Sequence, residues 1–133
     1  EKQVMAGRLV CDSYLAAKEH LRETTYTLQE LARTQLDKHK EPIDFHMVPS
    51  YFSKTGDLLN LIEHNENDSY LVMLLVFKLM ILPLTKQLTA LAGNLWSRSL
   101  MSQRAERVEY LLLHEFHRLK YVMPDKAAFG ANK

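Results

Sequence analysis

A histidine and an aspartate at helical spacing are the residues of this sequence best suited to chemistry. His64 and Asp68 stand four positions apart, so one continuous helix would place both on the same face. An imidazole and a carboxylate placed in this way could share a metal ion or orient a water molecule. The structural alternative puts Asp68 at the positive N-terminal end of one helix and His64 at the end of the helix before it. From these residues alone, we favour the structural alternative.

Three arginines, Arg98, Arg104 and Arg107, are the best candidates for contacts with an anion. They lie in the basic part of the chain, since residues 84–133 carry 8 Lys and Arg against 4 Asp and Glu, a net +4. Residues 1–83 carry 9 against 12, a net −3. Such a bias favours a polyanion such as nucleic acid. Salt bridges to Glu106 or Glu109 explain the same arginines equally well.

No other motif in the sequence predicts catalysis or metal binding. His114 and His117 lack the four-residue spacing of the zincins. A Gly-rich phosphate loop, a Cys-based metal spacing and a nucleophile elbow are all missing. A single cysteine rules out an internal disulfide framework. We therefore predict no catalytic residue, no metal site and no cofactor within this sequence.

The elements that must position these residues centre on an apolar run over residues 71–82. Only Lys78 interrupts the run, which is shorter than the ~20 residues of a membrane span. We predict a core helix covered on every side and no contact with a membrane. Pro83 should end or kink this helix near Leu82. Residues 65–69 should cap it and separate it from a helix over residues 57–64.

The remaining segments predict a mainly α-helical fragment of a larger α/β protein. Residues 7–12 predict one buried strand and residues 121–124 an extended exit strand. Further helices are expected over residues 13–22, 27–36, 95–100 and 103–119, the first capped by Asp12 or Ser13 and the second by Thr27. Both ends of the sequence look cut, and the strand would need a partner from outside it.

Residues 87–101 and 104–114 resemble the family B DNA polymerases, most closely the alpha-type branch. The resemblance continues in residues 121–126 and, upstream, in residues 7–12, 17–18 and 26–28. It implies that residues 1–92 are the C-terminal half of a 3′–5′ exonuclease-like domain with an RNase H-like sheet. Residues 93–133 would then lead into the polymerase palm.

The resemblance also implies a function for the whole protein. This would be a nuclear, replicative DNA-directed DNA polymerase that extends RNA–DNA primers made by an associated primase. The expected partners are template DNA, the RNA–DNA primer, primase and accessory subunits. The parent enzyme would need Mg²⁺, whereas the fragment alone should be inactive. Arg98, Arg104 and Arg107 would be its DNA-binding candidates.

Proofreading members of the family carry a Tyr-x-x-x-Asp motif, in which Asp binds a metal ion and Tyr orients the attacking water. The matching positions here are His64 and Asp68. Two-metal hydrolysis needs several converging oxygen ligands, and one Asp cannot supply them. The resemblance therefore implies a vestigial motif in an exonuclease fold kept as a scaffold. Two alternatives remain: active proofreading with Asp68 as a metal ligand, and a stand-alone helical interaction module.

Overall fold

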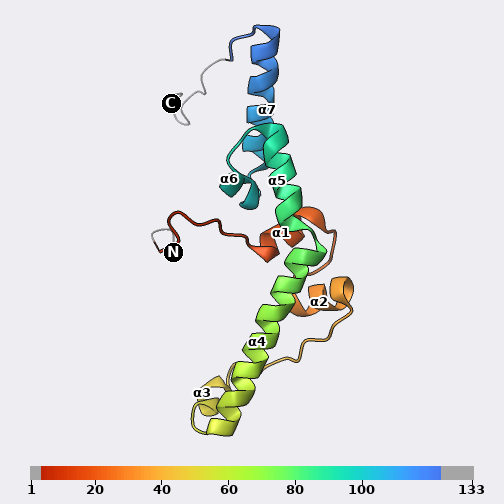
Figure 1. Cartoon of the computed structure of the whole chain (residues 1–133). Coiled ribbons are helices and arrows are strands. Elements are labelled where there is room, and N and C mark those ends of the chain that lie inside the picture. The colour runs from red at the N-terminus through yellow and green to blue at the C-terminus, as the bar shows by residue number, and fades with distance from the viewer. Residues whose placement is uncertain (1–3, 124–133) are drawn as a thin grey trace, which may run out of the picture. The chain divides into compact units, whose positions relative to one another are not determined.

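The computed structural model describes residues 4–123, and regular structure in this part of the chain is entirely helical. The chain divides into two compact units, residues 1–84 and residues 85–133, which are described separately. The helices are α1 (Ser13–His20), α2 (Leu28–Leu36), α3 (Val48–Tyr51), α4 (Thr55–Lys78), α5 (Ile81–Ala92), α6 (Trp96–Leu100) and α7 (Arg104–Leu119) (Figure 1).

The structure corrects the predicted fold class, because neither predicted strand is present in the described residues. Residues 9–12 are irregular, and the side chains of Leu9 and Val10 are exposed. Residues 121–123 are irregular as well, and Pro124 lies outside the described residues. A strand needs a neighbour to bond its backbone groups, and β-branched character alone does not supply one. The prediction of helices plus one or two strands was therefore wrong.

Helix α4 organises the first unit. Helices α1, α2 and α3 all pack against it, with α3 beside its N-terminal end (Figure 1). Ala17 of α1, Leu31 of α2 and Leu75 of α4 meet in a buried apolar cluster. Partly buried side chains surround this cluster: Leu21, Tyr26, Leu28, Leu36 and Leu79. The cluster fixes α1 and α2 on one side of α4.

The two packed helices begin where their caps predict. The Asp12 carboxylate accepts a hydrogen bond from the Tyr14 backbone N–H at 2.9 Å and starts α1. The Thr27 hydroxyl accepts one from the Glu30 N–H at 3.3 Å and starts α2. Each cap satisfies a donor that the first helical turn leaves without a partner. Both predicted caps are confirmed.

Helix α4 differs from the prediction in its length and in its burial. It runs without a break from Thr55 to Lys78, so residues 65–69 lie inside it and do not cap it. Only one face is covered: Leu71 and Leu75 are buried, whereas Phe77 is 66% exposed. Residues 65–69 are all polar, and they form part of this helix without ending it because their side chains lie exposed or half-buried. A helix covered on every side was a wrong prediction.

The chain breaks after α4 at Met80, whose φ is 51°, upstream of the predicted position. Pro83 falls in the first turn of α5. Backbone N–H groups in a first turn have no intrahelical acceptor, so a proline is tolerated there. Within residues 4–123 no single helix is long and apolar enough to cross a membrane, although α4 and α5 together pass that length and composition test as a bent pair.

The second unit is joined by a polar network. The Trp96 indole N–H donates to the Thr85 hydroxyl at 3.0 Å. The Thr89 hydroxyl donates to Ser99 Oγ at 2.6 Å, and the Asn94 side-chain amide contacts the same oxygen at 3.2 Å. Asn94 and Ser99 are buried, so these bonds replace water that the two side chains have lost. The network fixes α6 against the part of α5 that begins at Thr85.

Gly93 forms the turn between α5 and α6 with a φ of 79°. A Cβ atom there would overlap Nε2 of His114, which belongs to α7. Glycine therefore provides both the left-handed backbone and the close approach to α7. Helices α6 and α7 also contact each other directly.

Candidate functional site

The continuity of α4 brings His64 and Asp68 together. His64 Nε2 lies 3.6 Å from Asp68 Oδ2 because the two residues are one helical turn apart. Asp68 lies well inside α4, so the alternative that placed it at the N-terminal end of a helix is wrong. The alternative that we favoured from the sequence is thus the one that the structure corrects, and the common face that depended on a continuous helix is present.

Lys40 completes this cluster from outside α4. Its ammonium donates to Asp68 Oδ1 at 2.6 Å and to Oδ2 at 2.5 Å, and Nζ lies 3.2 Å from His64 Nε2. The three side chains are 17% to 28% exposed. An ammonium group can only donate, so a hydrogen bond between these two groups requires His64 Nε2 as the acceptor. The Lys40–His64–Asp68 cluster is thus a closed set of donors and acceptors.

Lys40 belongs to residues 37–42, which we call the strap. The strap starts at Asp37, whose φ of 52° ends α2, and the Lys38 N–H donates to Ala32 O at 3.0 Å. Lys38 Nζ lies 5.6 Å from the centroid of the Tyr70 ring, a cation–π contact. Two lysines of the strap therefore contact α4 at neighbouring positions.

Sequence reasoning missed Lys40. The strap reads as a charged loop, and 28 residues separate Lys40 from Asp68. Helical spacing relates residues three or four apart, and it relates nothing over that distance. The one available signal was the opposite charge of the two segments, which does not select Lys40 over Lys38.

The residues of this cluster do not fit a metal site. Both oxygens of Asp68 are engaged by the Lys40 ammonium, so a cation would have to displace a like charge to reach them. Within residues 4–123 no three His, Cys, Asp or Glu side chains converge to hold a metal ion. Hydrolysis by a two-metal mechanism needs several such ligands to hold its two metal ions.

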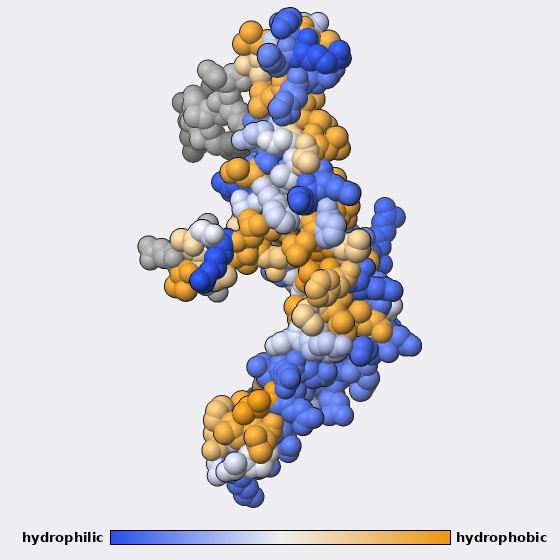
Figure 2. All heavy atoms as spheres, in the orientation of Figure 1, coloured by the Kyte–Doolittle hydropathy of each residue, from blue (hydrophilic) through white to orange (hydrophobic). Residues whose placement is uncertain are grey.

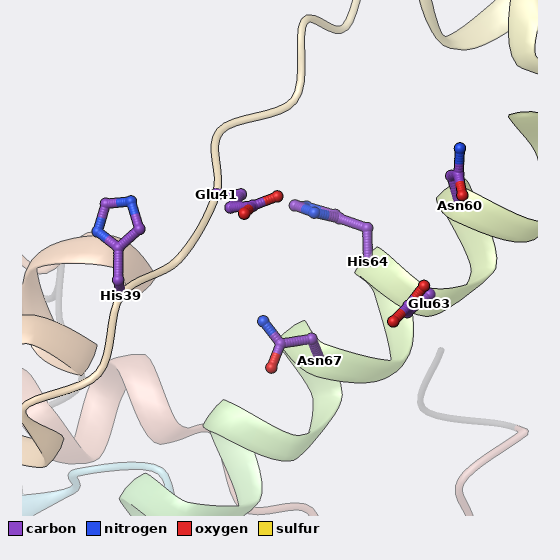
Figure 3. A pocket seen from close by; sticks show the side chains of 6 residues that line it. All are labelled: His39, Glu41, Asn60, Glu63, His64 and Asn67. Atoms are coloured by element: carbon purple, nitrogen blue, oxygen red, sulfur yellow. The ribbon is translucent and has the colours of Figure 1, made fainter.

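A cleft of about 590 Å³ lies beside the cluster (Figure 3). His39 and Glu41 line it from the strap, and α4 contributes the others, Asn60, Glu63, His64 and Asn67. Its lining includes two carboxylates and neither a lysine nor an arginine. Phosphates bind to sites with positive charge, so this lining is unsuited to a nucleic-acid backbone.

The predicted arginines lie on α6 and at the start of α7. The Arg98 side chain is 50% exposed, and its Nε lies 3.7 Å from Glu106 Oε2, so the predicted salt bridge to Glu106 is present. Arg104 is exposed and Arg107 half-buried, and their spacing makes them neighbours on the surface of α7. The contact between α6 and α7 brings Arg98 to the first turns of α7.

No family model matches the chain, but its curated relatives match almost all of it. It is 55% identical to the DNA polymerase alpha catalytic subunit of Dictyostelium discoideum over 92% of its length, and 49% identical to that of Oryza sativa subsp. japonica over 93%. It is 37% identical to that of Mus musculus over 97%. The chain spans only 8% to 9% of the length of these relatives. We conclude that the chain belongs to the family of the DNA polymerase alpha catalytic subunits, of which it is a fragment.

Proposed function

We propose that this chain is part of a replicative DNA-directed DNA polymerase that extends RNA–DNA primers made by an associated primase. The observation that carries the proposal is the identity of 37% to 55% over 92% to 97% of the chain with DNA polymerase alpha catalytic subunits. The parent enzyme would act in the nucleus with Mg²⁺, template DNA, primase and accessory subunits. Phosphoryl transfer of this kind uses metal ions to stabilise the attacking and leaving oxygens.

Within that enzyme we assign the fragment a structural role. Residues 1–92 would be the C-terminal part of the exonuclease-like domain, and residues 93–133 would lead into the polymerase palm. Helix α4 supports a scaffold role because it holds α1, α2 and α3 on one frame. The Lys40–His64–Asp68 cluster would then stabilise this frame.

Loss of proofreading is the second part of the proposal. It is supported by the ammonium of Lys40, which contacts both carboxylate oxygens of Asp68. Asp68 stands at the position of the metal-binding Asp in the motif of proofreading relatives. The cleft beside it carries two carboxylates, which would repel the phosphates of a primer end. Active proofreading, the alternative, would require Asp68 to exchange its lysine for a metal ion.

A stand-alone helical module is less well supported, because the first unit leaves large apolar side chains exposed. Figure 2 shows an apolar patch over α3 and the N-terminal end of α4. Exposed large apolar side chains in this part of the chain are Phe45, Met47, Phe52, Leu59 and Ile62. An isolated domain rarely leaves so much apolar surface together without a partner.

The test of the scaffold role uses the full-length parent on a primed template with a mismatched 3′ end and Mg²⁺. We expect extension of a matched primer, no degradation of the mismatched one, and no effect of Asp68→Ala on either result. The buried-core substitution Leu75→Ala controls for loss of folding. Degradation that disappears with Asp68→Ala would establish the proofreading alternative.

A second test addresses the arginines as DNA-binding residues. Replacing Arg104 and Arg107 with Ala in the full-length parent should weaken binding to primed DNA and lower the slope of log K against log salt by about 2, close to 0.9 for each phosphate that is no longer neutralised. Arg118→Ala is the matched control, since Arg118 lies on the same helix and pairs with Glu115. An unchanged slope would assign Arg104 and Arg107 to structure.

A further inference from the structure

We propose that Lys40 takes the place of a metal ion at Asp68, as a cation supplied by the chain itself. The proposal rests on the atoms that surround Lys40 Nζ. Asp68 Oδ1, Asp68 Oδ2 and His64 Nε2 lie 2.6 Å, 2.5 Å and 3.2 Å from it. A carboxylate and an imidazole nitrogen are also the ligand types that a divalent transition metal accepts.

The stoichiometry of hydrogen bonds supports this assignment. An ammonium group has three N–H donors, and the cluster offers three acceptor atoms around it. The ammonium leaves neither oxygen of the Asp68 carboxylate without a partner, and it also lies within hydrogen-bond distance of the His64 ring. A metal ion would bind these ligands only after the Lys40 ammonium had moved away from them.

Partial burial strengthens the interaction of the Lys40 ammonium with the Asp68 carboxylate. The side chains of Lys40, His64 and Asp68 are between 17% and 28% exposed, so solvent screens their charges less than on an open surface. If Lys40 were neutral, the Asp68 carboxylate would face the ring of His64 without a cation. Burial disfavours the charged form of such a carboxylate, and an opposite charge from solution at the same place would favour it again.

The strap does not depend on Lys40 alone. Lys38 retains its hydrogen bond to Ala32 O and its position over the Tyr70 ring, and Asp37 retains the turn that ends α2. A substitution at Lys40 should therefore remove the cation and leave the strap beside α4. Lys38→Ala is the matched control, because it removes the neighbouring lysine and keeps the Lys40–Asp68 contact.

The inference deepens the proposed function, since Asp68 is compared with the metal ligand of proofreading relatives. Its test reads metal binding and not nuclease activity, so the two proposals can fail separately. The full-length parent is exposed to Fe²⁺ with ascorbate and peroxide, which cleave the backbone next to a bound iron ion. The fragments are mapped by mass spectrometry, and cleavage elsewhere in the parent serves as an internal control.

The wild-type protein, Lys38→Ala and Lys40→Arg should show only background cleavage near residues 64–68. Lys40→Ala should raise cleavage there about tenfold above this background, which at low occupancy corresponds to a tenfold higher affinity for iron. The double variant Lys40→Ala with Asp68→Asn should return it to background. Cleavage above background at this position in the wild-type protein would overturn the proposal, because iron would then bind beside an intact Lys40.

A second variant covers the case in which one carboxylate binds iron too weakly for cleavage to be detected. Lys40→Glu replaces the cation with another oxygen ligand and should give the strongest cleavage of the series. Circular dichroism of each variant shows whether the helices are retained. If the folded proteins carrying Lys40→Ala and Lys40→Glu both remain uncleaved near residues 64–68, the site has no preference for a cation and the proposal fails.

Discussion

The two units of the chain are stabilised by different interactions. The first has an apolar cluster of Ala17, Leu31 and Leu75, on which α1 and α2 are fixed to α4. The second relies on hydrogen bonds around Ser99, and its longest helix, α7, has no buried residue. Apolar burial is the larger source of stability, so the cluster makes the first unit the better scaffold.

The charged pair of the first unit is also more buried than that of the second. Lys40 and Asp68 come from separate segments and are mostly buried, so each satisfies the other. Arg98 also faces a carboxylate, that of Glu106, but at 3.7 Å and with half of its side chain exposed. Lys40 has its donors engaged within the protein, whereas the exposed part of Arg98 can meet another anion. The following substitutions test this contrast.

The largest difference in the free energy of unfolding is expected between a substitution in the buried core of the first unit and one on the exposed face of α7. Leu75→Ala removes a buried side chain and should lower the free energy of unfolding by about 3 kcal/mol, because the cavity adds to the lost burial. Leu112→Ala on α7 changes an exposed side chain and should cost less than about 1 kcal/mol. Urea denaturation followed by far-UV circular dichroism measures both. Equal costs would contradict the proposed difference between the units.

A smaller loss is expected from the polar network of the second unit. Ser99→Ala removes the partner of the Thr89 hydroxyl and of the Asn94 amide and should cost about 1 to 3 kcal/mol. Trp96 is the only tryptophan, so its fluorescence reports the unfolding of this unit. Ser97→Ala, two positions before Ser99 on the same helix, is the control and should leave the midpoint unchanged. A wild-type midpoint for Ser99→Ala would show that the network contributes no stability.

The two charged pairs should differ by less, and a double-mutant cycle isolates each one. We expect Lys40→Met and Asp68→Asn to be coupled by about 1 kcal/mol, between the values of exposed and buried pairs. Arg98→Met and Glu106→Gln should be coupled by less than about 0.5 kcal/mol, since Arg98 is half exposed. Unfolding in urea gives both couplings. A stronger coupling for Arg98 would reverse the contrast.

The features that the sequence predicts correctly depend on residues close together in the chain. Asp12 and Thr27 cap helices within three residues of themselves, and the short helix that carries Trp96 follows a Gly-Asn turn. The pairing of His64 with Asp68 also depends on one helical turn, but we favoured the alternative because we expected the helix to break between them. Local hydrogen bonding and helical spacing determine all of these.

The failures have different physical causes. The strand expected over residues 7–12 needs a second strand that the described residues do not provide. The helix break expected at residues 65–69 was inferred from polarity, although polar residues also form the solvent-facing side of a helix. Lys40 was missed because its partner Asp68 is distant in sequence. Contacts between distant segments decide the first and the third point, whereas the second was a misreading of a local pattern.

The smallest effect is expected for a pair inside one exposed helix. The hydrogen bond from Arg118 lowers the pKa of the Glu115 carboxyl below its ordinary value, and both side chains are at least half exposed. A lowered folded-state pKa adds stability above the unfolded pKa, and this stability is lost as the pH falls through the folded-state value. Arg118→Ala should therefore raise the pKa of Glu115 in an NMR titration of its carboxyl carbon, and it should lower the unfolding midpoint at neutral pH only slightly, because solvent screens this exposed pair. Arg33→Ala should act likewise on Glu30 in α2, whose pKa is lowered by the same type of bond. A clear loss of stability at neutral pH in either variant would mean that a pair within one helix matters as much as the bond between the strap and α4, and the distinction between the two kinds of charge would fall.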